Sequence, residues 1–170
     1  MRLFKILPVF LLITCFTFTA QAQTELTSEQ KEAVENAVFE GWDGETYAIS
    51  DFRGKTVMID FWETWCAPCL NSFPGLNRAM VNYPDKFVVL ATSPMWMDSD
   101  TAVQRFIERN DYEFIYVKNA DLAIKLELES IPYKVFIDPD GNFYSAERGS
   151  AGAESEYNKI SEMVRRHHGE

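Results

Sequence analysis

The chain has 170 residues, a length that suits one domain with a complete hydrophobic core. Its composition is that of a globular protein, with 46% hydrophobic and 14% aromatic residues and a formal net charge of −10. This acidity argues against a nucleic-acid partner, because a polyanion is bound by a basic surface.

The first 22 residues have the pattern of a secretory signal peptide. A basic start at 1–5 precedes an apolar stretch at 6–18, and residues 20–22 fit a small-residue cleavage site. The stretch is short for a membrane span, so we expect cleavage near Ala22 and a mature domain at 23–170. An uncleaved membrane anchor is the alternative. Cys15 lies inside this leader, and Thr14 before it is not the small residue that usually precedes a lipid-modified cysteine.

The rest of the chain alternates between helix-like and strand-like patterns. In chain order we expect a helix at 27–38, a turn at 43–44 between strand-like residues, a turn at 53–55, a strand at 56–62, a helix at 66–83 kinked by Pro74, a strand at 87–92, a helix that begins at 98–100, a strand at 114–117, a helix at 119–126, strands at 134–137 and 143–145 around a turn at 138–141, and a helix at 153–166. This order predicts a layered α/β domain with parallel pairing and an antiparallel hairpin at one edge.

Cys66 and Cys69 are the only cysteines outside the leader, and they stand where the strand at 56–62 gives way to a helix. Two cysteines with this spacing at a strand-to-helix junction are typical of a redox pair. A structural disulfide and half of a zinc site are alternatives, although zinc needs two more ligands and the only histidines are His167 and His168 in the tail. Haem attachment needs a histidine where Leu70 stands.

Three motifs in this order resemble the TlpA/ResA-like branch of the thioredoxin-fold proteins. They are Gly54-Lys55 before the first core strand, the stretch 60–69 with its aspartate, two tryptophans and cysteine pair, and Ile131-Pro132 before the strand and turn at 135–141. The resemblance implies an α/β, thioredoxin-like fold with a central mixed β-sheet flanked by helices, a core at about 52–165 and an N-terminal extension. Such proteins are usually extracytoplasmic bacterial thiol-disulfide oxidoreductases, which agrees with the leader.

The resemblance implies catalytic roles for three residues. Cys66 is expected at the exposed start of the helix, where amide groups and the helix dipole lower the pKa of a thiol, and it would be the nucleophile. Cys69, one turn further and more deeply placed, would resolve the mixed disulfide. Asp60 would lie beneath the pair and accept a proton from the buried thiol. The alternative for Asp60 is a surface aspartate at a strand end.

The resemblance also implies a substrate-docking surface at the cysteine pair. The Ile131-Pro132 bond would be cis and face the cysteines, and the backbone there would pair with an extended substrate segment. Trp65 would help to shape this surface, and Pro68 stiffens the ring between the cysteines. The apolar run 95–97 permits two interpretations, which are packing against the segment next to the leader and a contact surface for a partner.

Two positions depart from the pattern of the relatives. Ser72 stands three residues after the second cysteine, where ResA-type proteins often carry glutamate. Glu63 stands three residues before the first cysteine, where alanine or glycine is common. A carboxylate near Cys66 would oppose the thiolate and raise its pKa, so Glu63 either tunes the chemistry or simply faces water.

Together with the leader and the cysteine pair, the resemblance implies an extracytoplasmic enzyme, in the periplasm, that reduces protein disulfides by exchange through Cys66 and Cys69. We expect no bound small-molecule cofactor and no metal, a protein or peptide disulfide as substrate, and a membrane-borne electron donor. Cytochrome c maturation is one outlet of such proteins. The alternatives are a disulfide-forming oxidase or isomerase, a redox-inert binding module, and a thiol peroxidase. The chain lacks the peroxidase motif Pro-x-x-x-Thr-x-x-Cys, because Ile59 and Glu63 occupy its proline and threonine positions.

Overall fold

The computed structural model describes residues 25–169, so the expected leader at 1–22 lies outside the described residues. The elements are α1 (Ser28–Glu35), β1 (Val38–Gly41), β2 (Thr46–Ala48), the 3-10 helix η1 (Ile49–Phe52), β3 (Thr56–Phe61), α2 (Ala67–Asn82), β4 (Phe87–Ser93), α3 (Asp100–Arg109), β5 (Ile115–Lys118), α4 (Ala120–Lys125), β6 (Tyr133–Ile137), β7 (Phe143–Arg148) and α5 (Ala153–His168). The expected alternation of strands and helices is confirmed.

The strands of the described chain form one mixed sheet in the order β2-β1-β5-β4-β3-β6-β7. Strands β3, β4 and β5 are parallel, and the terminal hairpin of β6 and β7 adds antiparallel to β3. The opposite edge also ends in an antiparallel hairpin, formed by β1 and β2, which pairs with β5. The sequence predicted the turn of this second hairpin but did not place its strands in the sheet.

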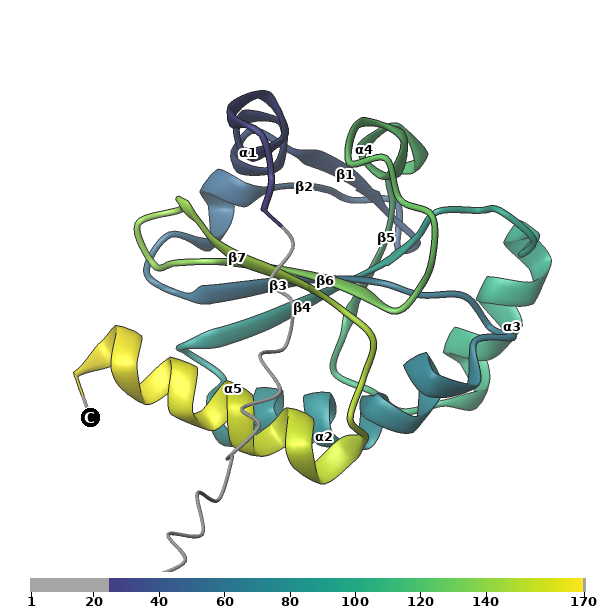
Figure 1. Ribbon diagram of the computed structural model, residues 1–170. Helices are drawn as coiled ribbons and strands as arrows, with labels where there is room; N and C mark the ends of the chain where they lie inside the picture. Colours follow the sequence, from purple (N-terminus) through teal and green to yellow (C-terminus); the bar gives the residue numbers. More distant parts are fainter. Residues whose placement is uncertain (1–24, 170) are drawn as a thin grey trace, which may run out of the picture.

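Helices cover both faces of the sheet, with α1 and α4 on one face and α2, α3 and α5 on the other (Figure 1). Alternate residues of β3 point to opposite faces, as the pleat of a strand requires. Val57, Ile59 and Phe61 belong to the cluster that includes α1 and α4, whereas Met58 and Trp62 belong to the cluster that includes α2 and α5. Asp60 shares the parity of Met58 and Trp62, so it faces the side of the sheet on which α2 carries the cysteines.

The local signals set most helix ends. Thr27 and Gln30 form the expected capping box at α1, but the helix ends at Glu35 because Val38 already begins β1. Helix α2 continues through Pro74 to Asn82. Gly75, the next residue, is buried against α5, and a Cβ there would collide with the backbone carbonyl of Ala153. This glycine therefore permits the close approach of α2 and α5.

Candidate active site

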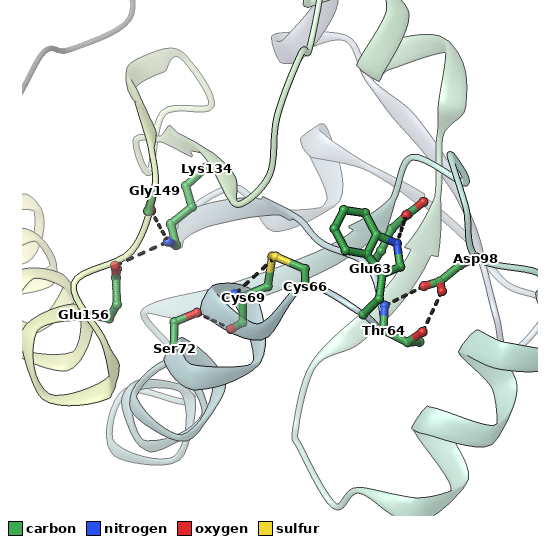
Figure 2. Close-up of a disulfide and its surroundings, with 10 residues drawn as sticks. Glu63, Thr64, Cys66, Cys69, Ser72, Asp98, Lys134, Gly149 and Glu156 are labelled. Carbon is green, nitrogen blue, oxygen red and sulfur yellow. Dashed lines mark hydrogen bonds and ion pairs between the residues drawn. A yellow bond between two sulfur atoms is a disulfide. The ribbon is translucent and has the colours of Figure 1, made fainter.

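Cys66 and Cys69 form a disulfide at the N-terminus of α2, with their Cα atoms 5.3 Å apart (Figure 2). Strand β3 ends at Phe61, and Cys66 is the N-cap of the helix, where its sulfur accepts a hydrogen bond from the Cys69 amide at 3.3 Å. The Cys66 sulfur thus lies at the helix terminus whose amide groups and dipole favour an anion. This placement agrees with the expected strand-to-helix junction.

The expected exposure of Cys66 is wrong for this oxidised protein. Its side chain is only 2% exposed, and Cys69 is fully buried. The reason is that the disulfide turns the Cys66 sulfur toward Cys69, and both cysteines join the hydrophobic cluster on which Met95 and Ile131 pack. Beside the pair, Trp65 is 51% exposed and Pro68 is exposed.

The bond between Ile131 and Pro132 is cis, as the resemblance implied. Ile131 packs against both hydrophobic clusters, including the one that contains the cysteines. The Pro132 carbonyl accepts a hydrogen bond from the Gly149 amide at 2.9 Å, and proline has no backbone N–H. Pro132 therefore has no N–H to offer to a substrate strand, and its carbonyl already has one partner.

Asp60 is fully buried, and the alternative of a surface aspartate is wrong. Neither carboxylate oxygen has a hydrogen-bond partner within the described residues. Burial raises the pKa of Asp60 from 3.8 to about 7, although the charge of Lys134, its register partner on β6, acts in the opposite direction. A carboxyl with this pKa can both accept and release a proton near neutral pH.

Sequence reasoning missed a buried group of charges centred on Lys134. Its ammonium donates to the Gly149 carbonyl at 2.9 Å and pairs with the Glu156 carboxylate at 3.3 Å (Figure 2). Glu156 also pairs with Lys159 at 2.8 Å, and Lys159 contacts Glu147 of β7. Burial raises the pKa of Glu156, but the two ammonium groups outweigh it and hold that pKa below its usual value. A lysine inside the apolar run of β6 was the signal that could have revealed this group.

Glu63 is fully buried, so the interpretation that it simply faces water is wrong. Its carboxylate accepts hydrogen bonds from the indole N–H of Trp65 at 2.5 Å, the Trp96 amide at 2.5 Å and the Met97 amide at 3.2 Å. Its tuning of the Cys66 thiolate stays a prediction. The hydrogen-bonding role was not foreseen, because two of the three donors, the amides of Trp96 and Met97, lie more than thirty residues further along the chain.

A second carboxylate connects the same two segments. Asp98 accepts hydrogen bonds from the amide and the hydroxyl of Thr64, both at 2.6 Å (Figure 2). In the run 95–97, Met95 packs on the cluster of the cysteines, whereas Trp96 and Met97 are 42% and 76% exposed. The segment after β4 is therefore fixed to the loop that joins β3 to Cys66.

Ser72, at the position where ResA-type relatives often carry glutamate, is buried in α2. Its hydroxyl donates to the Cys69 carbonyl at 2.6 Å. The residue thus forms a bond within the helix and brings no charge to the site.

A model of the AhpC/TSA family matches residues 30–146, more than half of the chain, and the protein therefore belongs to this family. The thiol-disulfide oxidoreductase ResA of Bacillus thuringiensis subsp. konkukian is 28% identical over 153 residues, which cover 86% of this chain and 87% of that protein. ResA of Bacillus subtilis is 28% identical over 131 residues, covering 76% and 72%.

Solved structures agree with this assignment. The exposed lipoprotein thioredoxin Etrx1 of Streptococcus pneumoniae matches with a TM-score of 0.63 and 26% identity, covering 75% of this chain and 98% of that one. StoA of Bacillus subtilis matches with a TM-score of 0.60 and 21% identity, covering 72% and 93%, which supports the fold alone. The thioredoxin-like fold and the likeness to ResA thiol-disulfide oxidoreductases, both expected from the motifs, are confirmed.

Proposed function

We propose that this protein is an extracytoplasmic thiol-disulfide oxidoreductase that reduces protein or peptide disulfides through Cys66 and Cys69. The observation that carries the proposal is the Cys66–Cys69 disulfide at a helix N-terminus, on the same side of the sheet as the buried Asp60, whose carboxylate has no hydrogen-bond partner. The cis Ile131-Pro132 bond, whose isoleucine packs on the cluster of the cysteines, supports it. The ResA relatives, which span most of the chain, support the same class of enzyme.

The proposed reaction is a two-electron exchange in two steps. The Cys66 thiolate attacks one sulfur of the substrate disulfide, forms a mixed disulfide and releases the first substrate thiolate. Cys69 then loses its proton to Asp60 and attacks the Cys66 sulfur, which re-forms the Cys66–Cys69 disulfide and releases the second substrate thiolate. The substrate gains two electrons, which a dithiol donor must return to the protein before the next cycle.

Reduction of a peptide disulfide by the pre-reduced protein tests this function. Wild type is expected to release two substrate thiols per molecule of protein. Cys66→Ser is expected to release none, and Cys69→Ser to stop at a mixed disulfide on Cys66. Reduction that survives Cys66→Ser, or a wild type that reduces no disulfide, would exclude the proposal.

The location and the electron donor rest on the sequence. The leader at 1–22 supports export to the periplasm, with a membrane anchor as the alternative, and a partner in the membrane would supply the electrons. No bound cofactor is required for the exchange. Within residues 25–169, no helix is both long enough and apolar enough to cross a membrane. N-terminal sequencing of the protein from a cell fraction tests cleavage near Ala22, and trapping with Cys69→Ser would capture the partners that bring a disulfide to Cys66.

A further inference from the structure

We propose that Glu63 holds a preformed apolar docking surface beside the disulfide and that its occupant is the apolar segment next to a cysteine of the substrate protein. This surface consists of the exposed side chains of Trp65, Trp96 and Met97, and we call it the tryptophan surface. The inference rests on the proposed function, since it concerns how the reductase selects its substrates.

The tryptophan surface exposes side chains that usually contribute to a core or to an interface. The chain has four tryptophans, of which Trp62 is fully buried, whereas Trp65 and Trp96 are 51% and 42% exposed. Met97 is 76% exposed. Tryptophan is enriched at binding surfaces, and methionine adapts its shape to irregular apolar partners.

Buried hydrogen bonds fix the surface in place. A buried carboxylate is unfavourable for folding unless N–H groups donate hydrogen bonds to it. Glu63 accepts such bonds from the indole of Trp65 and from the backbone amides of Trp96 and Met97, at 2.5 to 3.2 Å. Asp98 adds its two bonds to Thr64. Met95, between these links, has a φ of 58°, which a side chain of its size rarely adopts. The surface is therefore ordered before a substrate arrives, which lowers the entropy cost of binding.

Continuity with the cysteine pair identifies the occupant. Trp65 is the residue directly before Cys66, and Met95 packs on the cluster that contains both cysteines. A substrate whose sulfur reaches Cys66 brings its neighbouring residues next to Trp65, and Glu63 joins Trp65 to the segment that carries Trp96 and Met97. The three side chains of the surface carry no charge, so apolar neighbours of the substrate cysteine complement it best.

The test compares two peptide disulfides of equal length, one with leucine and phenylalanine beside the cysteine and one with serine and glutamine. The rate constants for their reduction by pre-reduced protein are measured for wild type and for the double variant Trp96→Ala/Met97→Ala. We expect wild type to favour the apolar peptide by about tenfold and the double variant to bring this ratio close to one. Ile124→Ala, which truncates a 73% exposed residue on α4, is the matched control and should keep the wild-type ratio.

Glu63 variants separate positioning from an effect on the thiol. Glu63→Gln keeps a carbonyl oxygen for the two amides but removes the charge, whereas Glu63→Ala removes both. We expect Glu63→Gln to retain most of the peptide preference and Glu63→Ala to lose it. The thiolate titration of Cys66 should be the same in the two variants, because both lack the charge of Glu63.

Three results would overturn the inference. Wild type could reduce both peptides at equal rates, which contradicts the tryptophan surface but leaves the reductase intact. Both Glu63 variants could shift the thiolate titration equally and change both rates alike, which would assign Glu63 to the chemistry. Sedimentation could instead show a dimer that Trp96→Ala/Met97→Ala dissociates, so that a second copy is the occupant. A wild type that reduces neither peptide would contradict the proposed function itself.

Discussion

At the scale of single residues, Asp60 is the group whose environment is hardest to explain by stability. A fully buried carboxyl without a hydrogen-bond partner is unfavourable for folding. Its place on the helix α2 side of β3 is consistent with the role that we propose for it, as the proton acceptor for Cys69. The sequence predicted this residue because an acid within the apolar run 56–62 must be buried if the run is a central strand. It could not show that both oxygens lack partners, which depends on the packing of α5 and β6.

The exchange rate should depend on the ionisation of Asp60. Below about pH 7 the folded protein keeps Asp60 protonated, and above that pH the carboxylate can accept the Cys69 proton. We expect the resolving step of wild type to accelerate as the pH rises through about 7. Asp60→Asn should slow this step by about 100-fold and remove that pH dependence. Stopped-flow measurements of mixed-disulfide resolution test this, with alkylation of Cys66 as the control for its own titration. Equal rates in both proteins at pH 8 would rule out Asp60 as the acceptor.

The same residue should make the folded protein less stable at higher pH. The pKa of Asp60 is raised by burial to about 7 from 3.8, so between these values the unfolded chain releases a proton that the folded protein retains. The contribution of Asp60 to the free energy of unfolding is most favourable below about pH 4. It falls as the pH rises to about 7 and then stays constant. The free energy of unfolding of Asp60→Asn, relative to that of wild type, should therefore increase by up to about 4 kcal/mol between pH 4 and pH 8. Urea unfolding of the oxidised proteins at both pH values measures this, and a difference that does not grow with pH would contradict it.

At the scale of elements, buried charges connect β6, β7 and α5 behind the disulfide. Lys134 pairs with Glu156 of α5, which pairs with Lys159, and Lys159 contacts Glu147 of β7. Lys134 also donates a hydrogen bond to the carbonyl of Gly149, and the amide of Gly149 donates to the carbonyl of Pro132. The cis-proline loop and the ionisation of Asp60 therefore depend on the same lysine. Single-residue patterns could not reveal this, because its partners come from three separate segments.

Lys134→Met should test this dependence. The change leaves Glu156 with one cationic partner and removes the charge that lowers the pKa of Asp60. We expect a loss of about 3 kcal/mol in the free energy of unfolding and a resolving step whose pH midpoint moves upward. Replacing both partners, in Lys134→Met/Glu156→Leu, should recover part of the stability, because the pair is removed rather than broken. A double variant no more stable than Lys134→Met would contradict this view of the pair.

The contact between α2 and α5 should depend on Gly75. A Cβ at this position would collide with the backbone of Ala153, which has no flexible side chain to move aside. We expect Gly75→Ala to lower the free energy of unfolding by about 2 to 3 kcal/mol despite the better helix propensity of alanine. Asn71→Ala, at an exposed position of the same helix, is the control and should be neutral or slightly stabilising. Thermal unfolding of the three proteins decides this, and a Gly75→Ala protein as stable as Asn71→Ala would show that α5 is free to shift.

For the molecule as a whole, the alternation of patterns and the three motifs were enough to predict the fold and the position of the cysteine pair in it, while the roles of the site residues stay predictions. The strand at 56–62, the cysteine pair and the Ile131-Pro132 bond were placed correctly because each has a strong local signal. The prediction of the β1–β2 hairpin was incomplete, since strands of three and four residues are too short to identify by pattern and are placed in the sheet by the pairing of β1 with β5. The exposure of Cys66 was misjudged and that of Glu63 was left open, because burial at both positions depends on segments distant in sequence.

The reduction potential of the Cys66–Cys69 pair decides whether this protein is a disulfide reductase. It is measured by equilibrating the protein with a thiol–disulfide buffer and counting free thiols. A reductase should have a potential near that of thioredoxin, about −270 mV. A potential near −120 mV would make the protein a disulfide-forming oxidase, and a pair that does not cycle between dithiol and disulfide would contradict a redox function altogether.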